Sequence, residues 1–230
     1  ALVSTASAAC APFNGSASPI WPRPASESYG DPSNSVGIMP SMFAFQLVNS
    51  TGGPVVPPPS LKAAFDRYVT ITFPEKSGEI CGYLLSSLDV TIDDASEKPP
   101  SIGDDETYEI KLQCDADCTA TLHAASLHGA MRGLETFSQL VDSTSSSLVV
   151  CAGLTVDDAP RFPYRGILVD TARHFINITR IEQIIDAMEM QKLNVLQLHL
   201  TDDQSFPFQS LTHPNITKYG AFDNSSIYTQ

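Results

Sequence analysis

Apolar residues recur three and four positions apart in three stretches of the chain, and this spacing predicts three amphipathic helices. The first is expected to begin at Ser60, whose hydroxyl can cap it, and the second to run from about Ser126 to Val141. The third is expected to begin at Thr179 and Glu182, which have the spacing of a capping box. The apolar stripes are Leu61, Ala64, Phe65 and Tyr68 in the first helix, Leu127, Ala130, Met131, Leu134, Phe137 and Val141 in the second, and Ile181, Ile184, Ile185, Met188 and Leu193 in the third.

Strand-like patterns lie between and after these helices. Residues 69–73 (VTITF) follow the first helix with a strand-like composition, and residues 88–92 and 108–112 alternate between acidic turns, so each is expected to be a strand. Residues 166–170 form a continuous apolar run, which is typical of a strand buried on both faces of a parallel sheet. Residues 195–200 alternate, and because a helix separates these last two strands, they should be parallel in a βαβ unit.

The segment before the first helix has a different composition. Residues 11–60 are rich in Pro, Ser and Gly, which indicates a lead-in with short extended pieces rather than part of a core. Residues 1–10 are small and apolar, as at the cleavage end of a signal peptide, although a frayed N-terminus has the same composition. We therefore expect residues 1–20 to be a leader or a flexible N-terminus.

Composition and charge exclude several classes of protein. A hydrophobic content of 42% and a charged content of 17% are those of a globular chain. The formal net charge of −13, without a cluster of Lys and Arg, disfavours nucleic acid as a partner. No apolar run approaches the roughly 20 residues that a bilayer span needs, so no membrane span is expected.

Cysteines and sequons point to a secretory route. The five cysteines lack the spacing of a zinc site, and no metal is expected. Cys114 and Cys118 could close a small disulfide loop, and the odd count leaves one thiol that is either buried or paired outside this chain. Five sequons make the following asparagines candidates for glycosylation: Asn14, Asn49, Asn177, Asn215 and Asn224.

Polar residues gather where the two strands of the βαβ unit end. Such positions carry the chemistry of parallel sheets. Arg173 is suited to fork two neighbouring oxygens of a ligand, whereas Asp202 and Asp203 repel each other and are more simply explained by a solvated turn. The residues at the two ends are Asp170, Arg173 and His174 after the first strand, and His199, Asp202 and Asp203 at the second.

Four segments resemble the family 20 glycoside hydrolases, the β-N-acetylhexosaminidases of the lysosomal or secreted eukaryotic type. They are WPRP at 21–24, GAMRGLETFSQL at 129–140, PYRGILVDTARHF at 163–175 and NVLQLHLTDDQSFPFQS at 194–210. The resemblance implies an α/β protein in which a non-catalytic α+β domain at 21–158 precedes the start of a catalytic (β/α)₈ TIM barrel at 159–230. We expect the chain to stop inside that barrel, after about two strands.

The resemblance also implies an activity and its residues. Terminal β-linked N-acetylglucosamine or N-acetylgalactosamine would be released with retention, by attack of the sugar's own acetamido oxygen. Arg173 would bind the hydroxyls at carbons 3 and 4, Asp202 would support a His and the acid/base Glu, and His199 and Asp203 would lie behind them. Animal members commonly have His, Trp, His where this chain has Gln197, Leu198 and His199, so a proton-handling role at 197 is lost.

The family's catalytic Asp–Glu pair does not follow Asp203 in this sequence, so we expect it beyond Gln230 and expect this chain alone to be inactive. The resemblance implies no cofactor, an amino-sugar oligosaccharide or glycoconjugate as substrate, a lysosomal or secreted location, and a homodimer as one assembly open to the full-length form. The alternatives are a carbohydrate-binding or scaffold protein without activity and an inactive truncated product.

Overall fold

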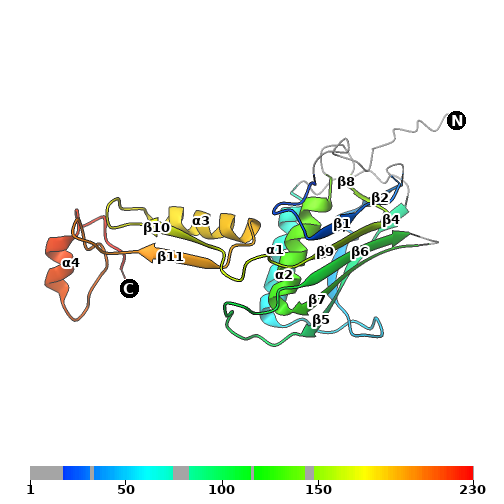
Figure 1. Ribbon diagram of the computed structural model, residues 1–230, viewed down its shortest axis with the longest axis horizontal. Coiled ribbons are helices and arrows are strands. Elements are labelled where there is room, and N and C mark those ends of the chain that lie inside the picture. The colour runs from blue at the N-terminus through cyan, green and yellow to red at the C-terminus, as the bar shows by residue number, and fades with distance from the viewer. Residues whose placement is uncertain (1–17, 32–33, 75–82, 115–116, 143–147, 230) are drawn as a thin grey trace. The chain divides into compact units, whose positions relative to one another are not determined.

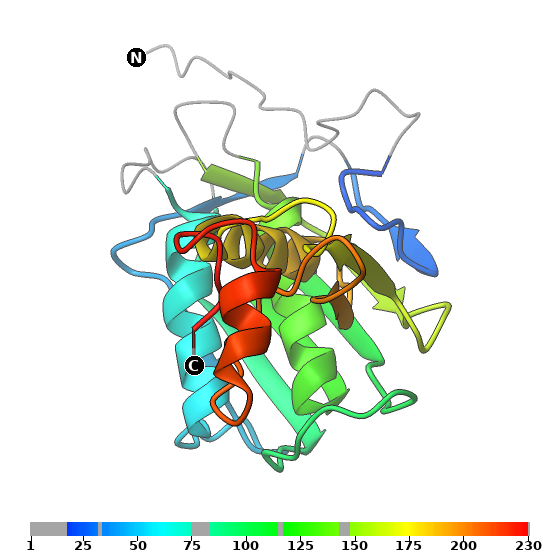
Figure 2. The same cartoon turned by 90° about the vertical axis from the view of Figure 1, so that its left-hand side faces the viewer.

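The computed structural model describes residues 18–31, 34–74, 83–114, 117–142 and 148–229. The chain divides into two compact units, Ala1–Arg161 and Phe162–Gln230, and each is described by itself (Figures 1 and 2). Both units combine helices and strands, which confirms the mixed α/β class. The expected leader and the sequon at Asn14 lie outside the described residues, apart from positions 18–20.

The first unit is built on a six-stranded sheet with the order β1-β9-β6-β7-β5-β3, and a three-stranded sheet has the order β4-β2-β8. Helices α1 and α2 lie side by side on one face of the larger sheet (Figures 1 and 2). The bounds are β1 Ser26–Ser28, β2 Ser35–Ile38, β3 Ala44–Leu47, α1 Pro59–Thr72, β4 Tyr83–Leu85, β5 Ser87–Asp94, β6 Tyr108–Cys114, β7 Cys118–Ser126, α2 Leu127–Leu140, β8 Leu148–Cys151 and β9 Leu154–Asp158.

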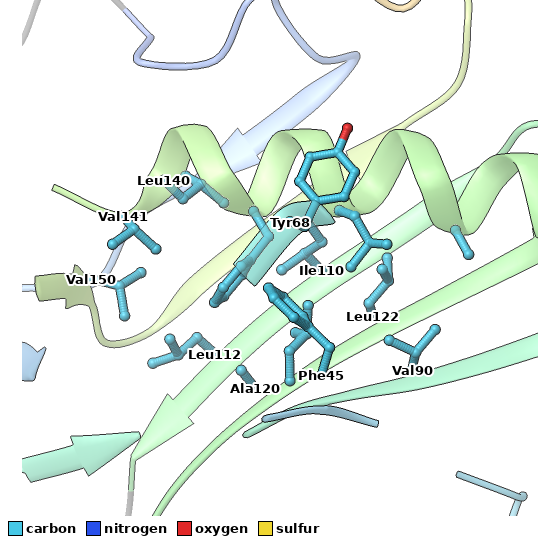
Figure 3. Close-up of a cluster of buried hydrophobic side chains, with 14 of the residues drawn as sticks. Phe45, Tyr68, Val90, Ile110, Leu112, Ala120, Leu122, Leu140, Val141 and Val150 are labelled. Carbon is cyan, nitrogen blue, oxygen red and sulfur yellow. The ribbon is translucent and has the colours of Figure 1, made fainter. Parts of the chain in front are cut away.

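The core of this unit lies between the helices and the sheet (Figure 3). Alternation places Tyr108, Ile110 and Leu112 of β6 on the buried face, as the sequence predicts. Ser126 caps α2, because its Oγ accepts a hydrogen bond from the backbone N–H of Gly129 at 3.1 Å. The strands expected at 88–92 and 108–112 and the helix expected at 126–141 are therefore confirmed.

The strand expected at residues 69–73 is wrong, because α1 continues to Thr72. Helical spacing from Tyr68 brings Thr72 onto the same buried face, so packing overrides the strand preference of Val69 and Ile71. The helix also begins before Ser60, with Pro58 at the N-cap and a proline at the first helical position.

The interpretation of residues 11–60 as a lead-in is wrong for its described second half. Strands β2 and β3 belong to the two sheets, and their apolar side chains are buried. The strands are only four residues long, so Pro- and Gly-rich turns dominate the composition while the apolar positions still fill the core. The buried aliphatic and aromatic side chains of the described part of this segment are Ile20, Val36, Ile38, Phe43, Phe45, Leu47 and Val48.

Cys114 and Cys118 form the small disulfide loop that their spacing predicts. The two residues face each other in the antiparallel β6–β7 pair, with their Cα atoms 4.1 Å apart. Cys151 is a buried thiol at the end of β8, while Cys10 and Cys81 lie outside the described residues. The disulfide ties together two neighbouring strands of the larger sheet.

The second unit contains the βαβ arrangement that the pattern predicts. Strands β10 (Gly166–Asp170) and β11 (Val195–His199) pair in parallel, with Gly166 opposite Val195, and α3 (Ile178–Met190) lies between them in sequence. A short helix that the sequence analysis did not predict, α4 (Pro214–Gly220), follows. No helix among the described residues has the length and apolar character needed to cross a bilayer.

Two details of this unit differ from expectation. Helix α3 begins before the supposed capping box, because Asn177 Oδ1 accepts from the backbone N–H of Arg180 at 2.9 Å and serves as the N-cap. Strand β10 is not buried on both faces, since Leu168 is 57% exposed. Leu198 of β11 is 37% exposed on the opposite face, since the register pairs it with Val169 and not with Leu168.

Candidate active site

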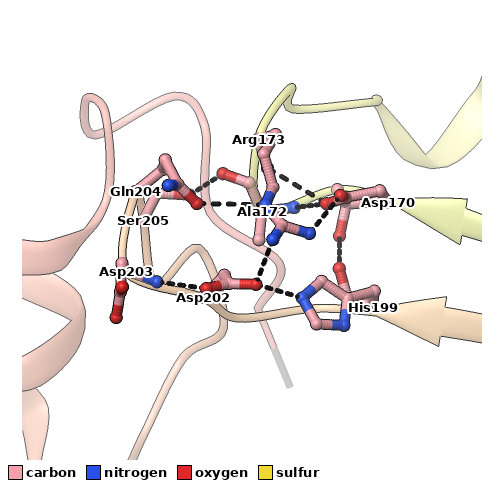
Figure 4. A network of polar contacts seen from close by, with 9 residues as sticks. Asp170, Ala172, Arg173, His199, Asp202, Asp203, Gln204 and Ser205 are labelled. Carbon is pink, nitrogen blue, oxygen red and sulfur yellow. Dashed lines mark hydrogen bonds and ion pairs between the residues drawn. The ribbon is translucent and has the colours of Figure 1, made fainter.

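The candidate site lies where β10 and β11 end (Figure 4). Because the strands are parallel and in register, Asp170 pairs with His199 at their carboxyl ends. The backbone N–H of Thr171 then donates to the carbonyl oxygen of His199 at 3.0 Å, which continues the pairing one step past the strands. The loops that follow are therefore held next to each other at this edge.

The guanidinium of Arg173 is at the centre of the site and contacts three side chains (Figure 4). Its Nη1 donates to Asp170 Oδ2 at 2.6 Å, and its Nη2 lies 2.7 Å from Asp202 Oδ2. Its Nε donates to the amide oxygen Oε1 of Gln204 at 3.0 Å. The side chain of Arg173 remains 52% exposed despite these three contacts.

Asp202 connects the arginine to the histidine. Its Oδ2 also lies 2.7 Å from Nε2 of His199, and because a carboxylate only accepts, that nitrogen carries the hydrogen. Its Oδ1 accepts from the backbone N–H of Asp203 at 2.7 Å. The backbone N–H of Asp202 donates to the carbonyl oxygen of Ser205 at 3.0 Å, which closes the turn.

The charges in the site reinforce one another. The pKa of the Asp202 carboxyl is lowered, most strongly by the hydrogen bond from the backbone N–H of Asp203. The hydrogen bond from His199 and the positive charge of Arg173 lower it further. The pKa of the Asp170 carboxyl is lowered by hydrogen bonds from the backbone and side chain of Arg173. The pKa of Arg173 is raised in turn, mainly by its bond to Asp170. Both carboxylates are thus ionised at neutral pH and present acceptors to a fixed cation.

The structure brings together Arg173, His199 and Asp202 from the sequence prediction, and places Asp203 beside them through its backbone. The side chain of Asp203 is exposed, and His174 is exposed in the loop after β10. Gln204 was missed, because a Gln in a polar turn has no distinctive pattern; only its position directly after the two aspartates could have indicated it. Among the described residues, no group of three or more His, Cys, Asp or Glu side chains could hold a metal ion.

The four described sequon asparagines are all exposed: Asn49, Asn177, Asn215 and Asn224. Asn49 lies in the turn after β3, where its Oδ1 accepts from Thr51 Oγ1 at 2.7 Å and from the backbone N–H groups of Thr51 and Gly53 at 3.0 and 2.9 Å. These bonds use the carbonyl oxygen of the amide, while a glycan attaches to Nδ2. Glycosylation of Asn49 is therefore compatible with the folded turn.

We expect Asn49 to carry an N-glycan when the chain is secreted from eukaryotic cells. Peptide mapping after enzymatic deglycosylation should find Asp at this position, and Thr51→Ala should abolish the modification because it destroys the sequon. The Thr51→Ser variant retains both the sequon and the hydroxyl and is the matched control. An unmodified Asn49 peptide from the secreted wild-type chain would contradict this expectation.

The chain matches models of known protein families and several known proteins. Residues 162–230 match the model of the glycosyl hydrolase family 20 catalytic domain, and residues 20–140 match a model described as beta-acetyl hexosaminidase like. The chain is 36% identical to beta-hexosaminidase 1 of Arabidopsis thaliana, over 91% of this chain and 40% of that protein. It is 40% identical to beta-hexosaminidase subunit beta of Mus musculus, over 79% of this chain and 34% of that protein.

Solved structures share the fold. A chitobiase from Flavobacterium johnsoniae matches with a TM-score of 0.70 and 24% identity, over 92% of this chain and 31% of that chain. A β-N-acetylhexosaminidase from Streptomyces coelicolor matches with a TM-score of 0.64 and 19% identity, over 92% of this chain and 41% of that chain. The chain thus spans about two fifths or less of the length of each of these proteins. Because the hexosaminidase-like model alone matches more than half of the 230 residues, the chain belongs to glycosyl hydrolase family 20.

Proposed function

We propose that the protein containing these residues is a β-N-acetylhexosaminidase that releases terminal β-linked N-acetylglucosamine or N-acetylgalactosamine. The observation that carries the proposal is the ion pair between Arg173 and Asp202, 2.7 Å long, at the carboxyl ends of two parallel strands. Enzymes built on parallel strands place their reactive groups at this end. The names of the Arabidopsis and mouse relatives support the same activity.

In this proposal Arg173 binds the sugar. A guanidinium has five N–H donors in one plane, and the contacts to Gln204, Asp170 and Asp202 account for three of them. The other two belong to the terminal nitrogens, one on each, and N–H groups of a guanidinium can recognise two adjacent oxygens. The hydroxyls at carbons 3 and 4 of a terminal sugar present such a pair.

Asp202 has a supporting role in this proposal. Its ionised carboxylate holds the arginine fork in place and accepts the Nε2 hydrogen of His199, which fixes the orientation of the imidazole. Through this network it would tune the acid/base Glu, which protonates the leaving oxygen while the substrate's acetamido oxygen attacks the anomeric carbon. Residues 166–230 contain no adjacent Asp–Glu pair, so we assign the acid/base Glu and the acetamido-orienting Asp to another part of the barrel.

The proposal extends to domains, location and assembly. Residues 21–158 form a non-catalytic domain, and residues 159–230 supply the first two strands of a (β/α)₈ barrel; the parallel pair β10 and β11 with its intervening helix supports this assignment. The disulfide between Cys114 and Cys118 and the exposed sequons support a lysosomal or secreted location. A homodimer of the full-length enzyme is part of the same proposal.

The test is hydrolysis of a chromogenic N-acetyl-β-glucosaminide by the full-length protein, compared with its Asp202→Asn variant. Loss of the charge should lower kcat/KM by about 10- to 100-fold, the usual scale for hydrogen bonds to a charged partner. The matched control is Asp203→Asn, which makes the same substitution at the adjacent residue. It keeps the backbone N–H that donates a hydrogen bond to Asp202 Oδ1. That control should change kcat/KM by less than about threefold.

Sugar binding without turnover by the wild-type protein would instead favour a carbohydrate-binding protein. Equal losses in the Asp202 and Asp203 variants would contradict the specific role given to Asp202.

A further inference from the structure

Gln204 is the member of the site whose role the proposed function does not explain. Its side chain comes from the turn after β11, whereas Arg173 comes from the loop after β10, and the two meet through Oε1 and Nε at 3.0 Å (Figure 4). Gln204 is exposed, so the contact is not forced by burial of the amide. A contact that forms at an exposed position must be favoured by the local geometry.

The conformation of the turn that carries Gln204 is fixed by contacts of the residues around it. The hydroxyl of Ser205 is buried and donates to the carbonyl oxygen of Ala172 at 2.6 Å, next to Arg173 in the chain. The carbonyl oxygen of Ser205 accepts from Asp202 N–H at 3.0 Å. The turn that carries Gln204 is therefore closed by its own backbone and attached to the loop that carries Arg173 by the hydroxyl of Ser205, without the Gln204 side chain.

The planar shape of the guanidinium shows what the third contact adds. Nη1 is bound to Asp170 and Nη2 to Asp202. With contacts only at Nη1 and Nη2, the guanidinium can still rotate about the line through these two atoms. A third contact, at an atom away from that line, prevents this rotation. Nε is the atom off that line, and Gln204 holds it. The direction of the fork offered to a ligand depends on this plane, and small misorientations of binding groups weaken binding.

The choice of a neutral acceptor also suits the site. Asp170 and Asp202 already place two carboxylates against the guanidinium, and the negative charge of Asp203 acts on it as well. An amide oxygen accepts the hydrogen bond from Nε without adding a fourth negative charge to the site.

We propose that Gln204 is a positioning residue that fixes the plane of the Arg173 guanidinium for sugar binding. This inference rests on the proposed function, because it takes Arg173 as the group that binds the sugar. Gln204 acts through the arginine and makes no contact with the substrate.

The experiment measures KM and kcat of the full-length enzyme for a chromogenic N-acetyl-β-glucosaminide. Gln204→Met keeps the length of the side chain and loses the acceptor, so KM should rise about three- to tenfold with kcat nearly unchanged. Gln204→Glu restores the acceptor but adds a negative charge; because position 204 is exposed and the charge is solvated, KM should still return to within about twofold of wild type. Gln183→Met is the matched control, because Gln183 accepts from Nη1 of Arg180 at 2.7 Å on α3, in the same kind of pair but outside the site.

A double-mutant cycle completes the test. In the Arg173→Ala background, Gln204→Met should have no further effect on kcat/KM, because the group that it positions is gone. Additive losses would overturn the proposal. Equal increases in KM for the Met and Glu variants would also overturn it, since they would indicate that the amide N–H groups bind the sugar directly. A loss of stability with KM unchanged would show a merely structural role and overturn it as well.

Failure of the proposed function gives a different result. In that case the wild-type enzyme does not turn over the substrate, or Arg173→Ala leaves kcat/KM unchanged, whatever occupies position 204.

Discussion

Replacing Arg173 with alanine is expected to lower kcat/KM of the full-length enzyme for N-acetyl-β-glucosaminides by about 30- to 1000-fold, or about 2 to 4 kcal/mol. The variant removes the fork that is proposed to bind two hydroxyls. It also leaves Asp170 and Asp202 without their shared cation, so the two negative charges are no longer offset. Both effects weaken binding of the substrate and of the transition state.

Lysine at position 173 should recover only part of this loss. An ammonium group restores the charge but cannot occupy three directions in one plane while offering a fork to the ligand. Arg180→Ala is the matched control, since Arg180 is an exposed arginine on α3 that pairs with Gln183. A kcat/KM for Arg173→Ala within about threefold of wild type would remove this arginine from the sugar site.

Much of the fold was predictable where one pattern decided the structure. The stripes that include Leu61 and Leu134 predicted the bodies of α1 and α2, and the alternation of β6 predicted its buried face. The failures occur where a longer pattern overrides a local one. Residues 69–73 have a composition typical of strands, but the helical face that begins at Leu61 continues through Thr72, and burial of that face decides the outcome.

Strand β7 was missed because most of its buried side chains are small. Strand β7 buries Ala120, Leu122 and Ala124, and two of these three alternate positions are alanines, which carry a weak apolar signal. The short strands β2 and β3 were hidden by their turns. These elements are specified by contacts distant in sequence, which a local pattern does not contain.

The candidate site was predictable as a location and in part as a set of residues. Parallel strands end at one edge, so the polar residues at the two strand ends were predicted to mark one location, and Asp170 and His199 pair there in the sheet. The ion pair of Arg173 with Asp202 could not be derived from spacing, because it depends on the conformations of two loops. The contact with Gln204 depends on the same loops and on the buried hydroxyl of Ser205.

The second large effect concerns the stability of the first unit. Phe137 is fully buried in α2 and packs against Phe43, with ring centroids 5.8 Å apart, and against Phe45, at 5.9 Å. Replacement with alanine should lower the free energy of unfolding of this unit by about 3 to 5 kcal/mol, because the substitution removes buried apolar surface and leaves a cavity. Phe137→Leu retains much of the volume and should cost less than about 2 kcal/mol.

Hydrogen exchange is the suitable measurement, because the chain contains two units and a single melting curve would mix them. The amides of β6 and β7 lie at the centre of the sheet, so their slowest exchange reports global opening of the first unit. A loss of 3 to 5 kcal/mol corresponds to exchange that is faster by about two to four orders of magnitude. The control is Val56→Ala, because Val56 is 90% exposed and its truncation should change the free energy by less than about 0.5 kcal/mol. If Phe137→Ala leaves exchange in β6 and β7 as slow as the control does, the aromatic cluster is not what holds α2 to the sheet.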